Sequence, residues 1–168
     1  MIARRMLDDL ERRLRATCAD AADAEGFGAA LRAIQDAFAA ALGTIHCLGP
    51  DDHLHLVAAS PGLPAPVLAA SRRIPLGKGI AGEAARTAQP VTLCNLQTDT
   101  SGVARPGARA TGAGGSLCVP ILDGARVVGT LGIGWMHERA ITDDEAARLM
   151  ALGRVLAAAL AREPRAGG

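Results

Sequence analysis

Two cysteines stand at the ends of one polar segment of this 168-residue chain, and two arginines lie within it. Thiols and guanidinium groups can take part in chemistry or bind ligands. Cys94 and Cys118 lie at the ends of apolar runs, and Arg105 and Arg109 lie in the glycine-rich stretch between them. Such a segment could hold a metal, form a redox pair, cradle a phosphate or cover a ligand pocket. The four cysteines of the chain are widely spaced and form no CxxC pair, so the sequence lacks the zinc-knuckle pattern.

Two glycine-rich stretches raise the question of nucleotide binding. Residues 77–82 match GxGxxG, and Asp99 lies near the distance expected for a ribose-binding acid. A dinucleotide fold needs a buried strand before this motif, whereas the preceding piece is short and contains Pro75. We therefore interpret the motif as a tight turn that enters a helix. Residues 110–116 lack the GK[ST] ending of a phosphate loop, which argues against nucleotide hydrolysis.

The histidines and thiols show no diagnostic ligand spacing. His53 and His55 alternate with leucines beside a turn, which is typical of a solvated strand face. No histidine–cysteine pair has metal-ligand or haem-ligand spacing, so no metal-binding residue is predicted and no cofactor is identified. A cysteine nucleophile needs a nearby base. Cys94 and Cys118 lie in apolar strands, where buried thiols usually act as small hydrophobic side chains.

Periodicity predicts the elements that position these residues. Apolar side chains at helical spacing predict helices over residues 3–18 and 26–42, with Gly43 as the stop of the second. A last helix starts near Ile141, where Thr142 and Glu145 fit a capping box. Short helices are predicted within the 61–73 linker and before Pro90. Short apolar runs predict strands over residues 44–49, 53–60, 91–96, 115–122 and 126–135. Helices, then hairpins, then a helix indicate an α+β fold with a mainly antiparallel sheet.

Composition restricts the class of protein. A hydrophobic fraction of 49% and a charged fraction of 21% indicate one globular domain. A formal net charge of +1 gives no field to attract nucleic acid or a membrane surface, so neither is expected as a partner. No apolar stretch reaches the roughly 18 residues of a membrane span. The basic start is followed by acidic residues rather than an apolar core of a signal peptide, so we expect a cytoplasmic protein with reduced thiols.

Four segments together resemble a GAF domain. They are IHCLGPDDHLHLVAAS, RRIPLGKGIAGEAARTAQPVTLCNLQTD, GGSLCVPILDGARVVGTLGIG and ITDDEAARLMALG. The resemblance implies a GAF/PAS-like fold, with a central antiparallel sheet, helices on both faces and a ligand pocket over one face. It also implies dimerisation through the first and last helices. We assign residues 1–25 to an N-terminal dimerisation helix, 26–162 to the GAF domain and 163–168 to a disordered tail.

The chain also resembles free methionine sulfoxide reductases over the same span, but their reactive groups are missing. The cysteine of their glycine turn is replaced by Ala81, and residues 95–117 contain no cysteine. The carboxylates of their LDID motif are replaced by residues 131–134, LGIG. The signatures of cyclic-nucleotide-binding and bilin-binding GAF domains are not apparent either. We therefore expect no catalytic residue in this chain.

From these observations we predict that the protein is a sensor that binds a small molecule. We expect it to form a homodimer and to signal through a separate protein. The pocket is expected between the sheet and the loop 96–114, where the arginines could bind an anionic ligand or could simply be solvated. Trp135 ends a glycine-rich strand and either lines the pocket or packs in the core. The expected ligand-binding residues are Cys94, Thr98, Asp99, Thr100, Arg105, Arg109, Thr111, Ser116, Cys118 and Trp135.

Two other functions stay open at this point. The first is a thiol-based redox enzyme or sensor of the free methionine sulfoxide reductase type, which would use Cys94 and Cys118 if their strands are neighbours. The second is a structural dimerisation module whose pocket is filled by its own side chains.

Overall fold

Six strands of the computed structural model, which describes residues 2–20, 23–104 and 106–162, form one curved sheet. The strands are β1 (Leu42–Leu48), β2 (His53–Ala59), β3 (Arg73–Pro75), β4 (Val91–Leu93), β5 (Ser116–Asp123) and β6 (Arg126–Gly134). Their order in the sheet is β3-β2-β1-β6-β5-β4, and every neighbouring pair is antiparallel. The predicted α+β class with a central antiparallel sheet is confirmed.

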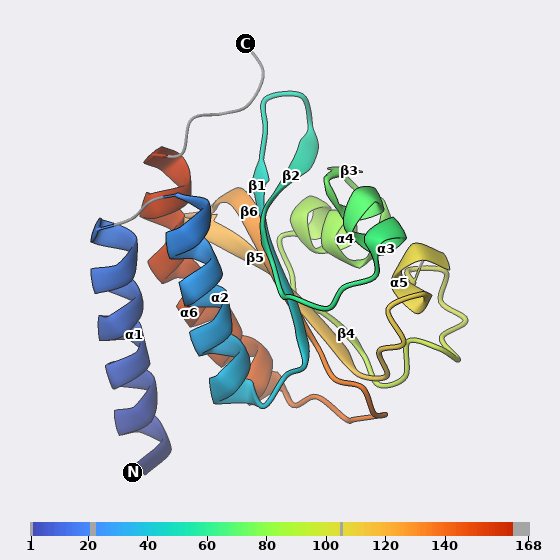
Figure 1. The fold of residues 1–168 in the computed structure, drawn as a ribbon, viewed down its shortest axis with the longest axis horizontal. Helices are drawn as coiled ribbons and strands as arrows, with labels where there is room; N and C mark the ends of the chain where they lie inside the picture. The colour runs from blue at the N-terminus through green and yellow to red at the C-terminus, as the bar shows by residue number, and fades with distance from the viewer. Residues whose placement is uncertain (1, 21–22, 105, 163–168) are drawn as a thin grey trace.

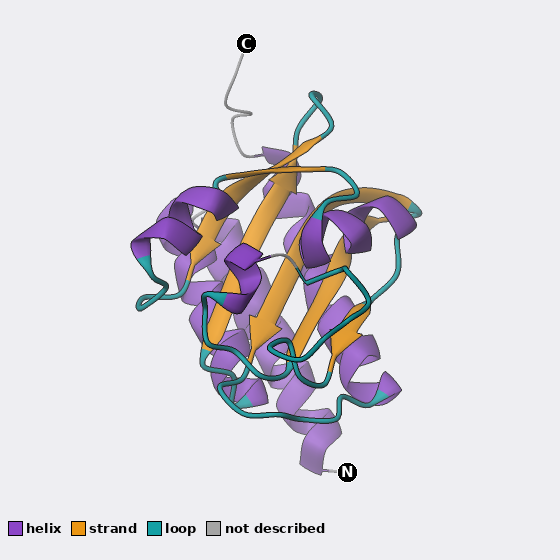
Figure 2. Ribbon diagram, turned by 90° about the vertical axis from the view of Figure 1, so that its right-hand side faces the viewer, coloured by secondary structure: helices purple, strands orange, loops and turns teal. Residues whose placement is uncertain are grey.

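Helices cover both faces of the sheet, as predicted (Figure 1). One face carries the long helices α1 (Ile2–Asp20), α2 (Ala24–Phe38) and α6 (Asp143–Arg162). The other face carries the shorter helices α3 (Ala65–Ser71), α4 (Gly79–Thr87) and α5 (Pro106–Arg109). Figure 2 looks onto this second face, where the short helices and their loops lie in front of the strands. No helix in the described part of the chain is long and apolar enough to cross a membrane.

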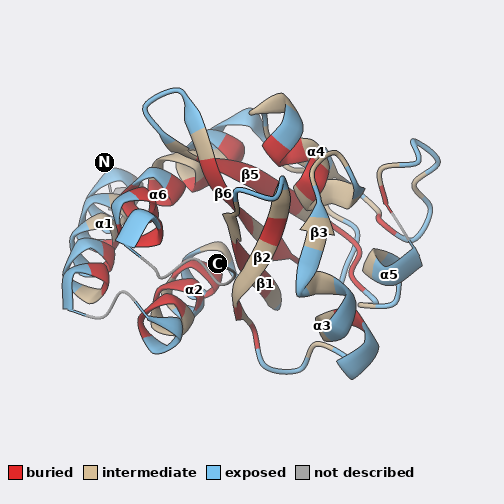
Figure 3. Cartoon of the chain, turned by 90° about the horizontal axis from the view of Figure 1, so that it is seen from above, coloured by how far each residue is buried: buried red, intermediate tan, exposed pale blue. Residues whose placement is uncertain are grey.

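The main hydrophobic core lies between the sheet and the three long helices. Successive strand residues point to opposite faces, so one alternating set of each central strand enters this core. Ile45, Val119 and Leu131 are directly opposite one another on β1, β5 and β6, and all three are fully buried. Leu149 and Leu156 of α6 pack onto this set from the helix side. Figure 3 shows the buried residues gathered between the two layers.

The other set of the central strands faces the short helices. Thr44 of β1, Gly132 of β6 and Cys118 of β5 are aligned across the sheet, and Leu42, Gly134 and Ser116 form the next row. Apart from Leu42, these side chains are small compared with those of the core face. The sheet therefore separates a densely packed core from a face with room above it.

The end of the second helix differs from the prediction. The helix was expected to run to residue 42 and stop at Gly43, but α2 ends at Phe38, where Ala39 takes a left-handed conformation with φ 51°. Gly43 lies inside β1, and a Cβ built on it would approach Leu31 Cδ1 to 2.8 Å. This glycine allows α2 to lie close to the sheet and does not end the helix.

The start of the last helix agrees with the prediction. The Thr142 hydroxyl accepts a hydrogen bond from the Glu145 amide at 3.1 Å, and the Glu145 carboxylate accepts one from the Thr142 amide at 2.9 Å. This reciprocal pair is the predicted capping box. It anchors α6 where the chain leaves β6, and so sets the position of the helix that closes the core.

Candidate ligand-binding site

A cavity of about 700 Å³ lies on the second face of the sheet. Its floor is formed by β1, β5 and β6, and its walls by α3, β3, the first turn of α4 and the loop that follows β4. The apolar wall residues include Leu63, Val67, Ile74, Ile80, Leu96 and Ala113. A mostly apolar cavity of this size, with a few polar groups, is typical of a small-molecule site. The expected position of the pocket, between the sheet and the loop 96–114, agrees with this cavity.

Glycines of β6 open the floor of the cavity. A Cβ built on Gly132 would lie 3.3 Å from the Thr44 hydroxyl oxygen and 3.6 Å from the Cys118 sulfur. Any larger side chain at Gly132 would therefore enter the cavity between these two polar groups. Gly129 has another role, because its Cβ would lie 2.1 Å from the His46 carbonyl oxygen on β1. In the glycine-rich strand β6, one glycine thus opens the cavity and another allows the β1 backbone to lie close.

His46 is the most deeply buried ionisable side chain of the cavity wall. It is 2% exposed, and its Nε2 lies 2.9 Å from the carbonyl oxygen of Ser71, at the end of α3. Burial lowers the pKa of His46 to about 4, although the Ser71 contact acts in the opposite direction. The imidazole is therefore neutral at pH 7. Its Nδ1 has no hydrogen-bond partner among the described residues.

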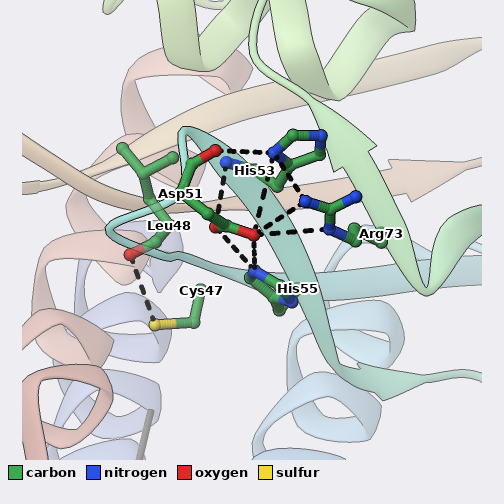
Figure 4. A network of polar contacts seen from close by, with 6 residues as sticks. All are labelled: Cys47, Leu48, Asp51, His53, His55 and Arg73. Atoms are coloured by element: carbon green, nitrogen blue, oxygen red, sulfur yellow. Dashed lines mark hydrogen bonds and ion pairs between the residues drawn. The ribbon is translucent and has the colours of Figure 1, made fainter. Parts of the chain in front are cut away.

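The charged residues of the cavity wall are all basic. Arg73 and Lys78 border the cavity, and none of the described lining residues is Asp or Glu. The Arg73 guanidinium lies 3.1 Å from the Asp51 carboxylate at the β1–β2 turn, and Asp51 also contacts His55 at 2.9 Å (Figure 4). His55 and then Arg73 hold the pKa of the Asp51 carboxyl below its usual value. Lys78 precedes α4 and is exposed, so it is available at the rim of the cavity.

Three of the predicted ligand-binding residues line the cavity. Ser116 and Cys118 belong to its floor, and Thr111 belongs to the loop that covers it. The structure places Cys94, Thr98, Asp99, Thr100 and Arg109 outside the lining, and Arg105 lies outside the described residues. Most of the residues that sequence analysis grouped in this loop are therefore not part of the cavity lining.

Arg109 holds the covering loop together. Its guanidinium donates a hydrogen bond of 2.5 Å to the carbonyl oxygen of Asp99. The Gln97 side-chain amide donates to the carbonyl oxygens of Arg109 and Ala113, at 3.0 and 2.9 Å. These contacts fold the two ends of the loop onto each other over the cavity.

Trp135 belongs to the main core and not to the cavity. It is 2% exposed, and its indole N–H donates to the carbonyl oxygen of Phe38 at 3.0 Å. The guanidinium of Arg139 lies over its ring at 4.2 Å from the centroid. Of the two possibilities raised by the sequence, the structure shows core packing.

Cys94 and Cys118 are not paired in the structure. The expectation that both face inward is wrong for Cys94, which is exposed beyond the end of β4. Val91 is the residue opposite Cys118, so Cys94 lies three residues further along, roughly 10 Å at the usual strand rise. A disulfide needs Cα atoms within about 7 Å. Burial also raises the pKa of the Cys118 thiol to about 12, which keeps it protonated.

Sequence analysis did not identify Thr44 and His46, two polar residues that line the cavity from β1. The alternation of β1 places Thr44 and His46 on the same face, because residues two apart on a strand share one face. That signal did not show which face of β1 meets the core and which meets a cavity. Ser71, whose carbonyl oxygen contacts His46, is brought there only by the docking of α3.

Comparison with known proteins relates the chain to one family. The family model described as GAF domain matches residues 24–161. Among curated proteins, none matches the chain.

Solved structures share the fold at low sequence identity. The GAF domain of an Acinetobacter phosphoenolpyruvate-protein phosphotransferase superposes with a TM-score of 0.76 at 18% identity, covering 95% of each chain. The corresponding domain from Coxiella burnetii gives 0.76 at 20% identity, covering 96% of this chain and 95% of that one. A free methionine-R-sulfoxide reductase from Neisseria meningitidis, in complex with its substrate, gives 0.72 at 17% identity, covering 92% and 88%. These similarities, all at 20% identity or less, establish the fold alone.

Proposed function

The chain belongs to the GAF domain family, and we propose that it is a sensor that binds a small molecule in the cavity over β1, β5 and β6. The cavity itself is the observation that carries this proposal. Its floor is opened by Gly132 and its walls are mostly apolar, as expected for a site that buries most of a ligand. A dimerisation module with a filled interior would leave no such space.

The chemistry of the cavity supports binding without catalysis. Cys118 is the cysteine among the described lining residues, and its raised pKa leaves it as a neutral thiol that is a poor nucleophile. Ala81 also lines the cavity. Free methionine sulfoxide reductases, which this chain resembles, carry a cysteine at this position, whereas alanine has no reactive group. The described lining also lacks a carboxylate that could bind a substrate ammonium group. The arrangement therefore does not support the thiol redox alternative.

The charges of the rim favour neutral or anionic ligands over cations. Lys78 supplies the positive charge of this rim, since Arg73 is ion-paired with Asp51, and the α4 amides at Gly79 and Ile80 follow Lys78 at the edge of the cavity. The positive end of the α4 dipole adds to this preference. The proposed anionic ligand would place its acid group at this rim and its apolar part over the floor.

Nuclear magnetic resonance tests the proposed binding. We expect indole and benzoate, at millimolar concentration, to shift the methyl signals of Val67, Ile74 and Ile80. In Gly132→Phe the added ring occupies the floor of the cavity, so neither indole nor benzoate is expected to shift these methyl signals. A cooperative thermal unfolding transition would show that this variant is folded. The control Gly28→Ala lies on α2, outside the cavity, where its Cβ would have only an ordinary contact of 3.7 Å with Arg32. Unchanged methyl signals in the wild type, or equal binding by Gly132→Phe, would contradict the proposal.

The proposed sensor is also expected to form a homodimer and to act on a separate signalling protein. α1 packs against α2 and α6 on the face away from the cavity, and Met6 of α1 is 66% exposed. An outer layer of this kind could pair with a second copy without covering the ligand site. Sedimentation equilibrium of the full chain tests this expectation, and a monomer at micromolar concentration would contradict it.

A further inference from the structure

We infer that Arg139, which is not among the described lining residues, is a positioning residue of the cavity, because it fixes the segment to which both ends of the covering loop (residues 94–115) are bonded. The inference rests on the proposed function, since it concerns how tightly the same cavity holds a ligand. The covering loop contributes Leu96 near its first end and Ala113 near its second end to the cavity wall. An anchor for both ends therefore sets the position of two wall residues.

Both ends of the covering loop are bonded to the connection between β6 and α6 (residues 135–142). At the first end, the Arg139 amide donates a hydrogen bond to the Cys94 carbonyl oxygen at 3.0 Å. At the second end, the Gly115 amide donates to the His137 carbonyl oxygen at 2.8 Å. The covering loop is thus held at both ends by the same short piece of chain, although it follows β4 in the sequence and that piece follows β6.

The second end of the covering loop lies in direct backbone contact with this connection. A Cβ built on Gly114 would overlap the His137 carbonyl group, and one built on Gly115 would lie 3.1 Å from the Arg139 Cβ. The two loop ends also bond each other, since the Leu96 amide donates to the Gly114 carbonyl oxygen at 2.7 Å. With no side chains between them, any displacement of residues 137–139 displaces the covering loop as well.

The Arg139 side chain fixes the connection in place. Its guanidinium lies 4.2 Å from the centroid of the Trp135 ring, within the range of a cation–π contact, and its Nη2 donates to the Glu145 carboxylate in the first turn of α6. The Arg139 and Glu145 side chains are only 29% and 20% exposed, so this ion pair is screened less than one in open solvent. One side chain therefore bridges the end of β6 and the start of α6 and holds the backbone between them.

This bridge affects ligand affinity through the order of the covering loop. Where the loop ends are held before a ligand arrives, binding does not have to order them. In Arg139→Ala the bridge is lost, and a ligand must fix the loop ends itself. The entropy of fixing about one residue of backbone corresponds to an affinity weaker by about five-fold or more. We expect the same loss for indole and benzoate, because the bridge lies outside the cavity.

Methyl shift titration with indole and benzoate measures the loss, with Val67 and Ile80 as reporters outside the covering loop. Arg139→Ala should bind both probes about five-fold more weakly than the wild type. Arg139→Lys keeps a cation at this position and should lose less. The matched control Arg148→Ala removes an arginine that pairs with Asp144 in the first turn of α6 at 2.7 Å and is outside the cavity lining. This control should bind like the wild type.

Amide hydrogen exchange without any probe separates loop anchoring from a general loss of stability. In Arg139→Ala the amides of Leu96, Gly115 and Arg139 itself (now alanine) should exchange about five-fold faster or more, because their acceptors belong to the loop junction. The amides of Val119 and Leu131, in the centre of the sheet, should keep their wild-type rates. A variant that only destabilised the whole fold would accelerate all five.

The outcomes separate the inference from the proposed function. Wild-type affinity in Arg139→Ala, an equal loss in Arg148→Ala, a loss that Arg139→Lys does not reduce, or wild-type exchange at the loop amides would overturn the inference while leaving cavity binding intact. If neither probe shifts the methyl signals of the wild type, the proposed function is contradicted, and the exchange comparison still decides whether Arg139 anchors the covering loop.

Discussion

Lowering the pH from 7 to 5 should destabilise this protein through His46. The side chain is 2% exposed and neutral in the folded state, since burial lowers its pKa to about 4. In the unfolded chain a histidine has a pKa of about 6.5. Between these two values the unfolded state binds a proton that the folded state does not, so stability decreases as the pH decreases. The stabilisation is fully present above about pH 6.5, and it is lost progressively down to about pH 4.

The size of the effect follows from the two pKa values. At pH 5 the unfolded histidine is almost fully protonated, whereas about a tenth of the folded molecules carry the proton. The resulting loss of unfolding free energy between pH 7 and pH 5 is about 2 kcal/mol, and the full loss below pH 4 is roughly 3 kcal/mol. These values come from one group, and the carboxylates with lowered pKa, such as Asp99 and Glu145, add their own losses at lower pH.

Urea denaturation at pH 7, 6 and 5 measures this contribution when the wild type is compared with His46→Phe. The carboxylates are the same in both proteins, so their losses cancel in the difference. We expect the wild type to lose about 2 kcal/mol more than His46→Phe over this range. The control His137→Phe removes an exposed histidine and should follow the wild type. Parallel curves for wild type and His46→Phe would refute the conclusion that His46 is buried and neutral.

Three further predictions test the packing and the thiols. Gly129→Ala should lose about 3 kcal/mol or more in urea denaturation, because its Cβ would lie 2.1 Å from a β1 carbonyl oxygen; a loss below about 1 kcal/mol would contradict this contact. Thr142→Ala should lose about 1 kcal/mol through the capping box with Glu145, and an unchanged urea midpoint would show that the cap does not contribute. In the folded protein, iodoacetamide should modify the exposed Cys94 and spare Cys118 until urea unfolds the chain; equal labelling of the two by mass spectrometry would contradict the burial of Cys118.

The fold could be predicted from the sequence where local pattern and tertiary packing agree. The alternation in the hairpins and the capping box at Thr142 both predicted what the structure shows. The prediction failed at the end of α2, where glycine was expected to stop the helix. Ala39 takes the left-handed conformation there, and Gly43 is needed for contact with Leu31 instead. A rule about one residue type cannot distinguish these two uses of glycine, because the second depends on which helix lies over the strand.

The site could be predicted only in outline. The loop over the sheet was identified, and Thr111, Ser116 and Cys118 do line the cavity. The loop was also the most conspicuous polar segment, and this favoured residues such as Arg109 that in fact bond to the loop itself. Chemistry-bearing side chains in a loop often satisfy the loop's own backbone, and sequence alone does not show whether they have done so.

The fold alone does not decide between a sensor and an enzyme. Its neighbours include GAF domains of phosphotransferases and a free methionine-R-sulfoxide reductase, at 17–20% identity, where shared architecture carries no shared chemistry. The decision depends on the groups that face the cavity. An enzyme of the thiol type needs a reactive thiolate within reach of a substrate, and burial prevents Cys118 from becoming one. A sensor needs only space, an orienting polar group and a way to hold the ligand. Gly132 provides the space and the mostly apolar wall provides the contacts, which is why the cavity supports the proposed binding function.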